Sequence, residues 1–220
     1  MSLTRRRCLH AMLFGLPALA LAADTPPPVL HRRPGVAFGT TVAVTVAHPD
    51  PVLAELALDA AYAEIRAVER LTGLFHRDAA LARLNREGRL TDPAPELLDL
   101  LRLALDLHAA SGGAFDVTVQ PLWRCYADAL ATGRLPTGAA LAKARARVDA
   151  AGLELGRDRV RLLGAGMGVT LNGIAQGFAT DRVLARLRAL GIRHAFVDTG
   201  ELGLIGRRRG SEPWTMALPG

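Results

Sequence analysis

The sequence contains little cysteine, few aromatic residues and no apolar run of membrane-spanning length. It has 2 cysteines and 5% aromatic residues in 220 residues, too few to build a disulfide scaffold. Half of the residues are hydrophobic and 22% are charged, a balance that excludes a disordered acidic or basic tail. The length suits one large domain or two small ones with a buried core.

Common catalytic signatures are also missing. The chain has no G-x-S-x-G elbow, no H-E-x-x-H, no Walker loop and no cysteine pair at metal-site spacing. Glycines at 164, 166 and 168 begin like a dinucleotide fingerprint, but the third glycine of that pattern would fall on Val169. We therefore interpret residues 164–168 as a turn, and a nicotinamide oxidoreductase is the weakest of the alternatives.

Residues 1–22 have the composition of a secretory signal, in which three arginines at 5–7 precede an apolar run over 11–22. As a helix this run rises about 18 Å, against a hydrocarbon core of about 30 Å, so it is too short to span a membrane. Residues 4–10 resemble the twin-arginine export signal. The sequence therefore predicts a protein in the periplasm or on the outer face of the cytoplasmic membrane.

Half of the net positive charge lies in that leader. Removing residues 1–22 takes three of the 27 basic residues and none of the 21 acidic ones, so a net charge of +6 falls to +3. Because the remaining basic residues form no stripe interleaved with aromatics, we expect no nucleic-acid partner. Cleavage also removes Cys8 and leaves Cys125 alone, which predicts a core or half-buried free thiol.

The rest of the chain predicts an α+β fold, because strands and helices alternate without a regular βαβ rhythm. Residues 23–34 are rich in proline and predict an extended, unpaired tether before a domain over 35–220. Alternating valines predict a strand within 36–47, and Asp50 is the expected cap of a helix over 51–71. Further strands are predicted at 153–155, 159–162, 169–171 and 195–197, and further helices at 79–86, 95–110, 139–150 and 174–190.

Three segments place backbone or small residues where a ligand can approach. Residues 38–41 put a glycine inside a strand pattern, which indicates a bulge or a close backbone approach. Residues 111–116 join a glycine pair to an aromatic residue and an acid. Residues 170–181 turn from a predicted strand through Asn172 and Gly173 into a helix, whose first N–H groups attract phosphate and whose preceding carbonyl can ligate Mg²⁺. Each segment also has a purely structural interpretation as a turn, a helix stop or a helix cap.

Five segments in this order resemble the ApbE family of FAD:protein FMN transferases, over nearly all of residues 36–220. The amides at Asn172 and Gln176 further resemble the branch associated with nitrous oxide reductase maturation, the NosX type. Residues 38–41 resemble the family's M-G-T-T strand, 78–85 its D-S-E-L-S-R-L-N helix, 111–116 its S-G-G-A-F-D turn, 171–181 its L-G-G-I-A-K-G-Y-A-V-D segment and 197–201 its V-D-x-G-G-(D/E) loop.

The resemblance implies an enzyme that moves the FMN half of FAD onto a Thr or Ser hydroxyl of an exported or membrane-bound acceptor protein. AMP is released, and Mg²⁺ lies on the pyrophosphate. Such a reaction depends on holding the pyrophosphate in line and neutralising its developing charge, which metal and backbone donors can do without a covalent enzyme intermediate.

The resemblance also assigns binding residues by position. Phe38 stands where the family has a flavin-contacting Met, and Phe75 where it has a Tyr against FAD. Thr170 replaces an FAD-contacting Asp, and Gln176 replaces a Lys, so both positions are neutral here. The backbone oxygen of Gly173 corresponds to a Mg²⁺ ligand. The matching FAD-binding A-F-D residues are Ala114, Phe115 and Asp116.

Family members continue for roughly a further hundred residues after a central strand that residues 214–219 resemble. That part carries the rest of the Mg²⁺ site and the expected catalytic residues, so we expect this chain to be a C-terminally truncated member that lacks the final third of the fold. Two alternatives to an active transferase remain open. The chain can hold FAD as a carrier without transferring it, or it can be an inactive fragment.

Overall fold

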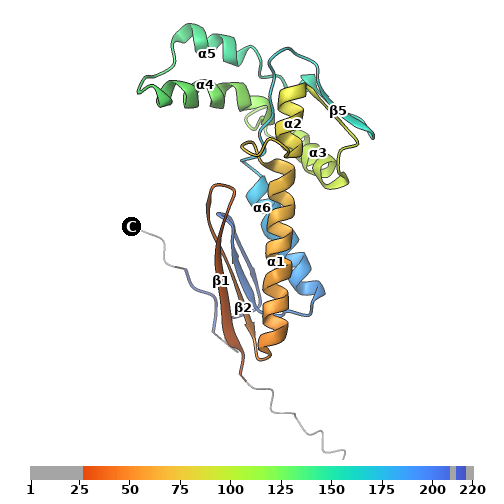
Figure 1. The fold of residues 1–220 in the computed structure, drawn as a ribbon, viewed down its shortest axis with the longest axis vertical. Coiled ribbons are helices and arrows are strands. Elements are labelled where there is room, and N and C mark those ends of the chain that lie inside the picture. Colours follow the sequence, from red (N-terminus) through yellow and green to blue (C-terminus); the bar gives the residue numbers. More distant parts are fainter. Residues whose placement is uncertain (1–26, 209–211, 217–220) are drawn as a thin grey trace, which may run out of the picture.

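The computed structural model describes residues 27–208 and 212–216. It shows a larger sheet with two helices beside it, and a lobe of further helices with a small sheet at one end (Figure 1). This mixture confirms the α+β prediction. In chain order the elements are β1 (Val29–Ala37), β2 (Thr40–His48), α1 (Pro51–Thr72), α2 (Ala80–Glu87), β3 (Arg89–Thr91), α3 (Pro95–Ala110), η1 (Val117–Val119), α4 (Gln120–Ala131), α5 (Gly138–Arg145), η2 (Ala150–Gly152), β4 (Leu153–Leu155), β5 (Arg159–Leu162), α6 (Ala175–Ala189), β6 (Ala195–Asp198) and β7 (Leu202–Ile205).

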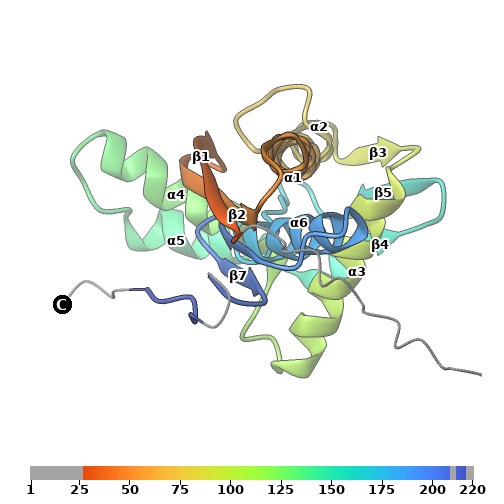
Figure 2. The same cartoon turned by 90° about the horizontal axis from the view of Figure 1, so that it is seen from below.

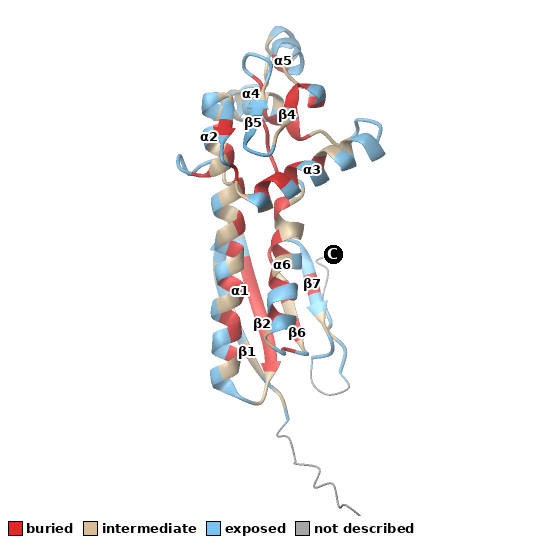
Figure 3. Ribbon diagram, turned by 90° about the vertical axis from the view of Figure 1, so that its right-hand side faces the viewer, coloured by how far each residue is buried: buried red, intermediate tan, exposed pale blue. Residues whose placement is uncertain are grey.

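The larger sheet has the order β1-β2-β6-β7, and every neighbouring pair is antiparallel. Helices α1 and α6 run side by side along it, α1 being seen nearly end-on in Figure 2. The alternating valines of β2 pack against these helices in the first of two cores. Figure 3 shows that the buried residues of both helices follow the side that meets the sheet. The first core includes Val42, Val44, Val46, Leu58, Ile65, Val183 and Leu187.

Helix α1 begins and ends where its sequence predicts. The Asp50 carboxylate accepts hydrogen bonds from the N–H groups of Val52 (2.8 Å) and Leu53 (3.4 Å), and Pro51 occupies the first turn. Its last N–H partner is Gly73, which donates to the Glu69 carbonyl at 2.8 Å. Alanines along the buried stripe let α6 and the sheet approach closely, and the Arg182 guanidinium of α6 reaches Glu64 of α1 at 2.8 Å.

The end lobe has its own core beneath α2, α3 and the three-stranded sheet β3-β5-β4. Leucines from the helices dominate it, and Val160 of β5 and Leu171 complete it. Helix α6 belongs to both cores, because Ala175 near its start lies in the second and Val183 lies in the first. The start of α6 therefore stands at the junction of the two cores.

The prediction of an unpaired tether is wrong for its second half. Residues 29–34 belong to β1, which pairs with β2 from Val29 opposite His48 to Ala37 opposite Thr40. Pro34 is tolerated there because β1 is an edge strand and needs no N–H toward solvent. The glycine at 39 likewise marks no bulge, since it lies in the turn between β1 and β2.

Other boundaries also differ from the expectation. The helix predicted over 139–150 ends at Arg145, because the chain turns so that the Asp149 N–H can donate to the Thr118 hydroxyl (2.9 Å). The strand predicted at 169–171 is absent from the described residues, since the backbone of Val169 bonds to a side chain instead. Residues 214–216 form no strand either, and 217–219 lie outside the described residues. No local sequence pattern predicted α4, β3 or β7.

Two further predictions concern cysteine and the leader. Cys125 is a half-buried free thiol, as predicted. The predicted signal over 1–22 lies outside the described residues. Among the helices that the structure does describe, none combines the length and the apolar character needed to cross a membrane.

Tyr62 offers a test of how β1 packs on α1. Its hydroxyl donates to the Arg33 carbonyl at 2.8 Å, and burial raises the pKa of the phenol above its usual value of about 10. The folded state therefore holds this proton where the unfolded chain loses it, so Tyr62 contributes stability below pH 10 that fades as the pH rises further. We expect Tyr62→Phe to lower the free energy of unfolding by about 1 kcal/mol at pH 7. Urea titrations should show the difference shrinking above pH 10; a constant difference would contradict this.

Candidate functional site

The tip of the β1-β2 hairpin is fixed to the end of α1. Phe38 and Gly39 have φ angles of 54° and 75°, the positive values that a two-residue turn needs to match the strand twist. The Phe38 N–H donates to Glu69 Oε1 at 2.8 Å. This bond compensates for a non-glycine residue in the left-handed region and holds the Phe38 side chain over the C-terminal turns of α1.

An open cleft of about 520 Å³ lies between this tip, the end of α1, the following loop and the start of α6. Its volume falls in the range of small-molecule sites. Three of the predicted site residues, Phe38, Phe75 and Gln176, line it together, although they are far apart in sequence. The other polar residues of the wall are Glu69, Thr72, His76 and Asn172.

Packing in a core does not explain why Phe75 lines this cleft. It is 81% exposed, and its one aromatic neighbour in the described residues is Trp123, in edge-to-face contact at 6.4 Å between ring centroids. Because the ring is exposed and lines the cleft, a ligand in the cleft can reach it. Its face is free to stack on a planar ring.

The start of α6 supplies polar backbone to the same cleft. The helix cap residue, Ile174, makes no side-chain cap bond, and Asn172, once a candidate for that role, is exposed. Within the part of the chain that the structure describes, the N–H groups of Gln176 and Gly177 have no acceptor. These donors and the positive end of the helix dipole suit an anionic group such as a phosphate.

Gln176 is held from behind by the loop at 197–201. The buried Thr199 hydroxyl donates to the Gln176 carbonyl (3.0 Å) and lies 2.7 Å from the hydroxyl of Thr180. Gly200 packs directly against the Gln176 side-chain amide. The resemblance includes this loop but gives it no role. The structure shows that Thr199 and Thr180, both buried, connect the loop to the start of α6.

The loop before α6 is clamped by Asn85. Its side-chain amide donates to the Val169 carbonyl (2.7 Å) and accepts from the Val169 N–H (2.6 Å). The next N–H, of Thr170, donates to the Val117 carbonyl (2.8 Å). Asn85 ends the motif at 78–85, and its positioning role was not apparent from sequence because its partner lies 84 residues away.

Thr170 and the A-F-D residues do not line the cleft. Thr170 is 9% exposed, and its hydroxyl accepts from the Asn172 N–H at 3.3 Å. Asp116 accepts from the N–H and the hydroxyl of Thr118 (2.7 and 2.6 Å), with His108 at 3.5 Å from its other oxygen. Ala114 is exposed outside the cleft.

Phe115 forms the floor of the Gly173 loop. A methyl group on Gly173 would lie 3.1 Å from Phe115 Cε2, so the ring packs directly beneath this residue. The Phe115 carbonyl accepts a hydrogen bond from His108 Nδ1 at 2.9 Å, which fixes the backbone of Phe115. Phe115 of the A-F-D segment therefore supports the loop that leads into α6.

The described residues do not by themselves fit a Mg²⁺ ion. Gly173 is exposed and offers one carbonyl, but no group of three or more His, Cys, Asp or Glu side chains in the described ranges could hold a metal. Mg²⁺ requires an octahedral set of oxygen ligands. We therefore derive no chemical step through the metal from these residues.

Fold and cleft together define an α+β protein with an open small-molecule site where its two cores meet. The model of the ApbE family matches residues 38–219, and the chain belongs to this family. It is 29% identical over 196 residues to the FAD:protein FMN transferase of Klebsiella pneumoniae, covering 84% of this chain and 55% of that protein. The Treponema pallidum protein of the same name is 29% identical over 183 residues, covering 77% and 50%.

Solved structures share the fold. The flavinyl transferase ApbE of Pseudomonas stutzeri, in its apo form, has a TM-score of 0.76 at 25% identity and covers 89% of this chain and 64% of that one. The flavin transferase ApbE of Vibrio cholerae also has a TM-score of 0.76, at 23% identity, with 87% and 64% covered. The chain thus spans between half and two thirds of the length of these proteins.

Replacing Asn85 tests the clamp. In Asn85→Ala both the N–H and the carbonyl of Val169 lose their partners, so the free energy of unfolding should fall by about 2 kcal/mol in urea titrations. Arg83→Ala, an exposed change on the same helix, should stay within about 0.5 kcal/mol of the parent. Equal effects of the two changes would refute a specific role for Asn85.

Proposed function

We propose that this chain binds FAD in the cleft and contributes to a FAD:protein FMN transferase, the activity for which its relatives are named. The convergence of Phe38, Phe75 and Gln176 on one cleft carries the proposal. These three positions were assigned to FAD by resemblance, and they come from a hairpin tip, a loop and a helix start. A chance likeness in sequence would not bring them to one cavity.

In the proposed complex the flavin and the phosphates take different walls. The exposed ring of Phe75 stacks on the isoalloxazine system, and Phe38 supports it from the hairpin tip. The pyrophosphate lies at the start of α6, where the N–H groups of Gln176 and Gly177 donate to its oxygens. Gln176 can add a neutral side-chain donor where the family has a charged lysine.

The transfer joins the acceptor hydroxyl to the FMN half. The hydroxyl oxygen of a Thr or Ser attacks the FMN phosphorus, and the bond from this phosphorus to the bridging oxygen breaks. AMP leaves with that oxygen and its electron pair, and the hydroxyl proton passes to a base. The contribution of the described residues is to bind and align the pyrophosphate for this displacement; we assign no catalytic residue among them.

Ala114, Phe115, Asp116 and Thr170 act in this proposal by supporting the cleft. Asp116 accepts hydrogen bonds from Thr118, Thr170 accepts one from the Asn172 N–H, and Phe115 packs beneath the Gly173 loop. The Gly173 carbonyl remains the proposed point of contact with Mg²⁺, whose other ligands would be phosphate oxygens, water and groups beyond the described residues. The dependence of the transfer on Mg²⁺ therefore needs its own test.

A second candidate is an FAD carrier without transferase activity. It is favoured by Thr170, which replaces a charged residue and whose hydroxyl is engaged with Asn172, and by the neutral Gln176. Binding of FAD without any AMP release would support it.

The proposed setting is the periplasm or the outer membrane face, with an exported or membrane-bound acceptor. Support comes from the twin-arginine-like residues 4–10, and the amides at 172 and 176 favour a role in nitrous oxide reductase maturation. We further propose that residues 1–22 are a signal. The domain predicted over 35–220 begins no later than Val29, because residues 29–34 belong to β1. Cell fractionation tests the location, because a cytoplasmic protein would contradict export.

If the flavin stacks on Phe75, removing this ring should lower the affinity for FAD. Phe75→Ala should weaken FAD binding roughly tenfold, since aromatic stacking contributes about 1–3 kcal/mol. FAD fluorescence titration measures the affinity. Leu135→Ala removes a side chain that is almost as exposed (78%) and lies outside the cleft, so it should change nothing. The same affinity for Phe75→Ala and the parent would exclude a flavin against this ring.

The activity itself is tested with FAD, Mg²⁺ and a Thr-containing acceptor domain. An acceptor mass increase of one FMN, with equimolar AMP release, is expected for a transferase. Omitting Mg²⁺ with a chelator should abolish both, and a Thr→Ala acceptor should stay unmodified. Bound FAD with neither product would reject transfer by this chain and leave the carrier.

A further inference from the structure

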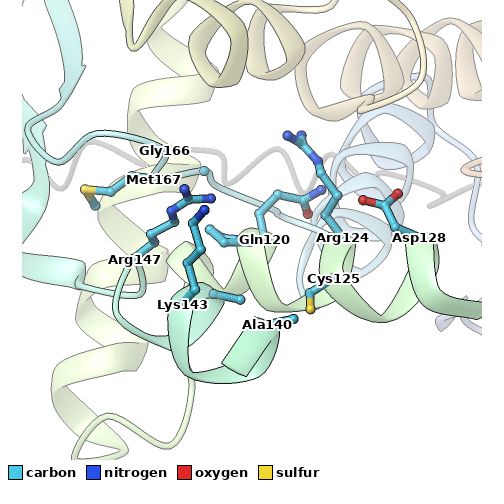
Figure 4. A pocket seen from close by; sticks show the side chains of 12 residues that line it. Gln120, Arg124, Cys125, Asp128, Ala140, Lys143, Arg147, Gly166 and Met167 are labelled. Atoms are coloured by element: carbon cyan, nitrogen blue, oxygen red, sulfur yellow. The ribbon is translucent and has the colours of Figure 1, made fainter. Parts of the chain in front are cut away.

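A second cleft, of about 260 Å³, lies in the end lobe between α4, α5 and the glycine-rich turn after β5 (Figure 4). It shares no lining residue with the proposed flavin cleft. Helices α4 and α5 pack on one another and project from the lobe (Figure 1). The family resemblance assigns no function to this place.

Three cationic side chains line this second cleft. Arg124 comes from α4, Lys143 from α5 and Arg147 from the segment that follows α5. Figure 4 shows Lys143 and Arg147 extending toward the same region, with Arg124 on the other side of Gln120. Asp128 is the single acidic side chain of the lining, and none of these four residues has an ion-pair partner within 4.0 Å in the described ranges.

The backbone of the turn allows this concentration of charge. The Arg147 guanidinium lies so close to Gly166 that a methyl group there would sit 2.9 Å from its Cζ. Gly166 has a φ of 75°, a backbone conformation that favours glycine. The turn therefore presents bare backbone at this position, and the Arg147 guanidinium packs against it.

Gln120 adds an unsatisfied polar atom between the cations. Its side chain is 4% exposed, and Oε1 is buried with no hydrogen-bond partner among the described residues. Figure 4 shows its amide between Arg124 on one side and Lys143 with Arg147 on the other. Buried acceptors in folded proteins nearly always have a donor, so this atom points to one that the chain does not supply.

We propose that this cleft binds a phosphate group, either free inorganic phosphate or the phosphate end of a small phosphate monoester. The tetrahedral oxyanion has enough acceptor oxygens for two guanidinium groups and an ammonium group. A protonated phosphate oxygen would also donate to Gln120 Oε1. The site is independent of the flavin proposal, and its volume fits one phosphate group with a small substituent at most.

Titration calorimetry of the full chain with inorganic phosphate tests this. Saturable binding is expected, and the double variant Lys143→Gln/Arg147→Gln should weaken it at least about tenfold, since each charge-assisted bond is strong. Arg145→Gln is the matched control, because it removes an exposed cation from α5 outside the cleft and should leave the affinity within about twofold. Lys143→Gln alone, a change at an exposed position, provides a second variant if the double variant unfolds.

Three comparisons complete the experiment. Sulfate carries no proton at neutral pH, so it should bind about tenfold more weakly than phosphate, and Gln120→Leu should abolish this preference. Binding of methyl phosphate that disappears in the double variant would identify a monoester source, and phosphate binding without methyl phosphate binding would identify the free ion. Fluorescence titration should give the double variant an unchanged FAD affinity, which separates this site from the flavin cleft. Absent phosphate binding, or equal losses in Arg145→Gln and the double variant, would overturn the proposal.

Discussion

The two hydrogen bonds between the Asn85 amide and the backbone of Val169 are the constraint on which the cleft depends. They fix a loop with no strand or helix of its own. Once Val169 is held, Thr170 bonds to Val117 and Leu171 enters the second core. Helix α6 then has one place to begin, and its first residues, Ala175 and Gln176, line the cleft together with Phe75.

The other walls are fixed by equally local devices. One carboxylate, Glu69, anchors the hairpin tip, and one hydroxyl, Thr199, anchors the first turn of α6. Glu69 satisfies an N–H in the hairpin turn that has no partner in the sheet, whereas Thr199 adds a hydrogen bond to a carbonyl within the first turn of α6. The cleft is thus built mainly from backbone geometry, so the side chains that line it, such as Gln176, can vary without loss of its shape.

Much of this was predictable from sequence, and the failures have a common cause. Helices with a clear cap and a stop, such as the one after Asp50, were placed within a residue or two. The strand expected at 169–171 failed because its partner is a side chain 84 residues distant, which no local pattern reveals. Phe38, Phe75 and Gln176 line one cleft, whereas Asp116, bonded to Thr118, and Thr170, bonded to Asn172, do not line it. The contacts of these residues with FAD stay a prediction.

Helix α6 crosses from one core to the other, and this has a thermodynamic consequence. Neither core can lose its packing without exposing part of the same helix, so the two are expected to melt as one cooperative unit. A ligand held at the start of α6 would then raise the stability of the sheet as well as that of the lobe, by mass action on a single unfolding equilibrium. Binding of a ligand in the cleft would therefore raise the melting temperature of the whole described domain.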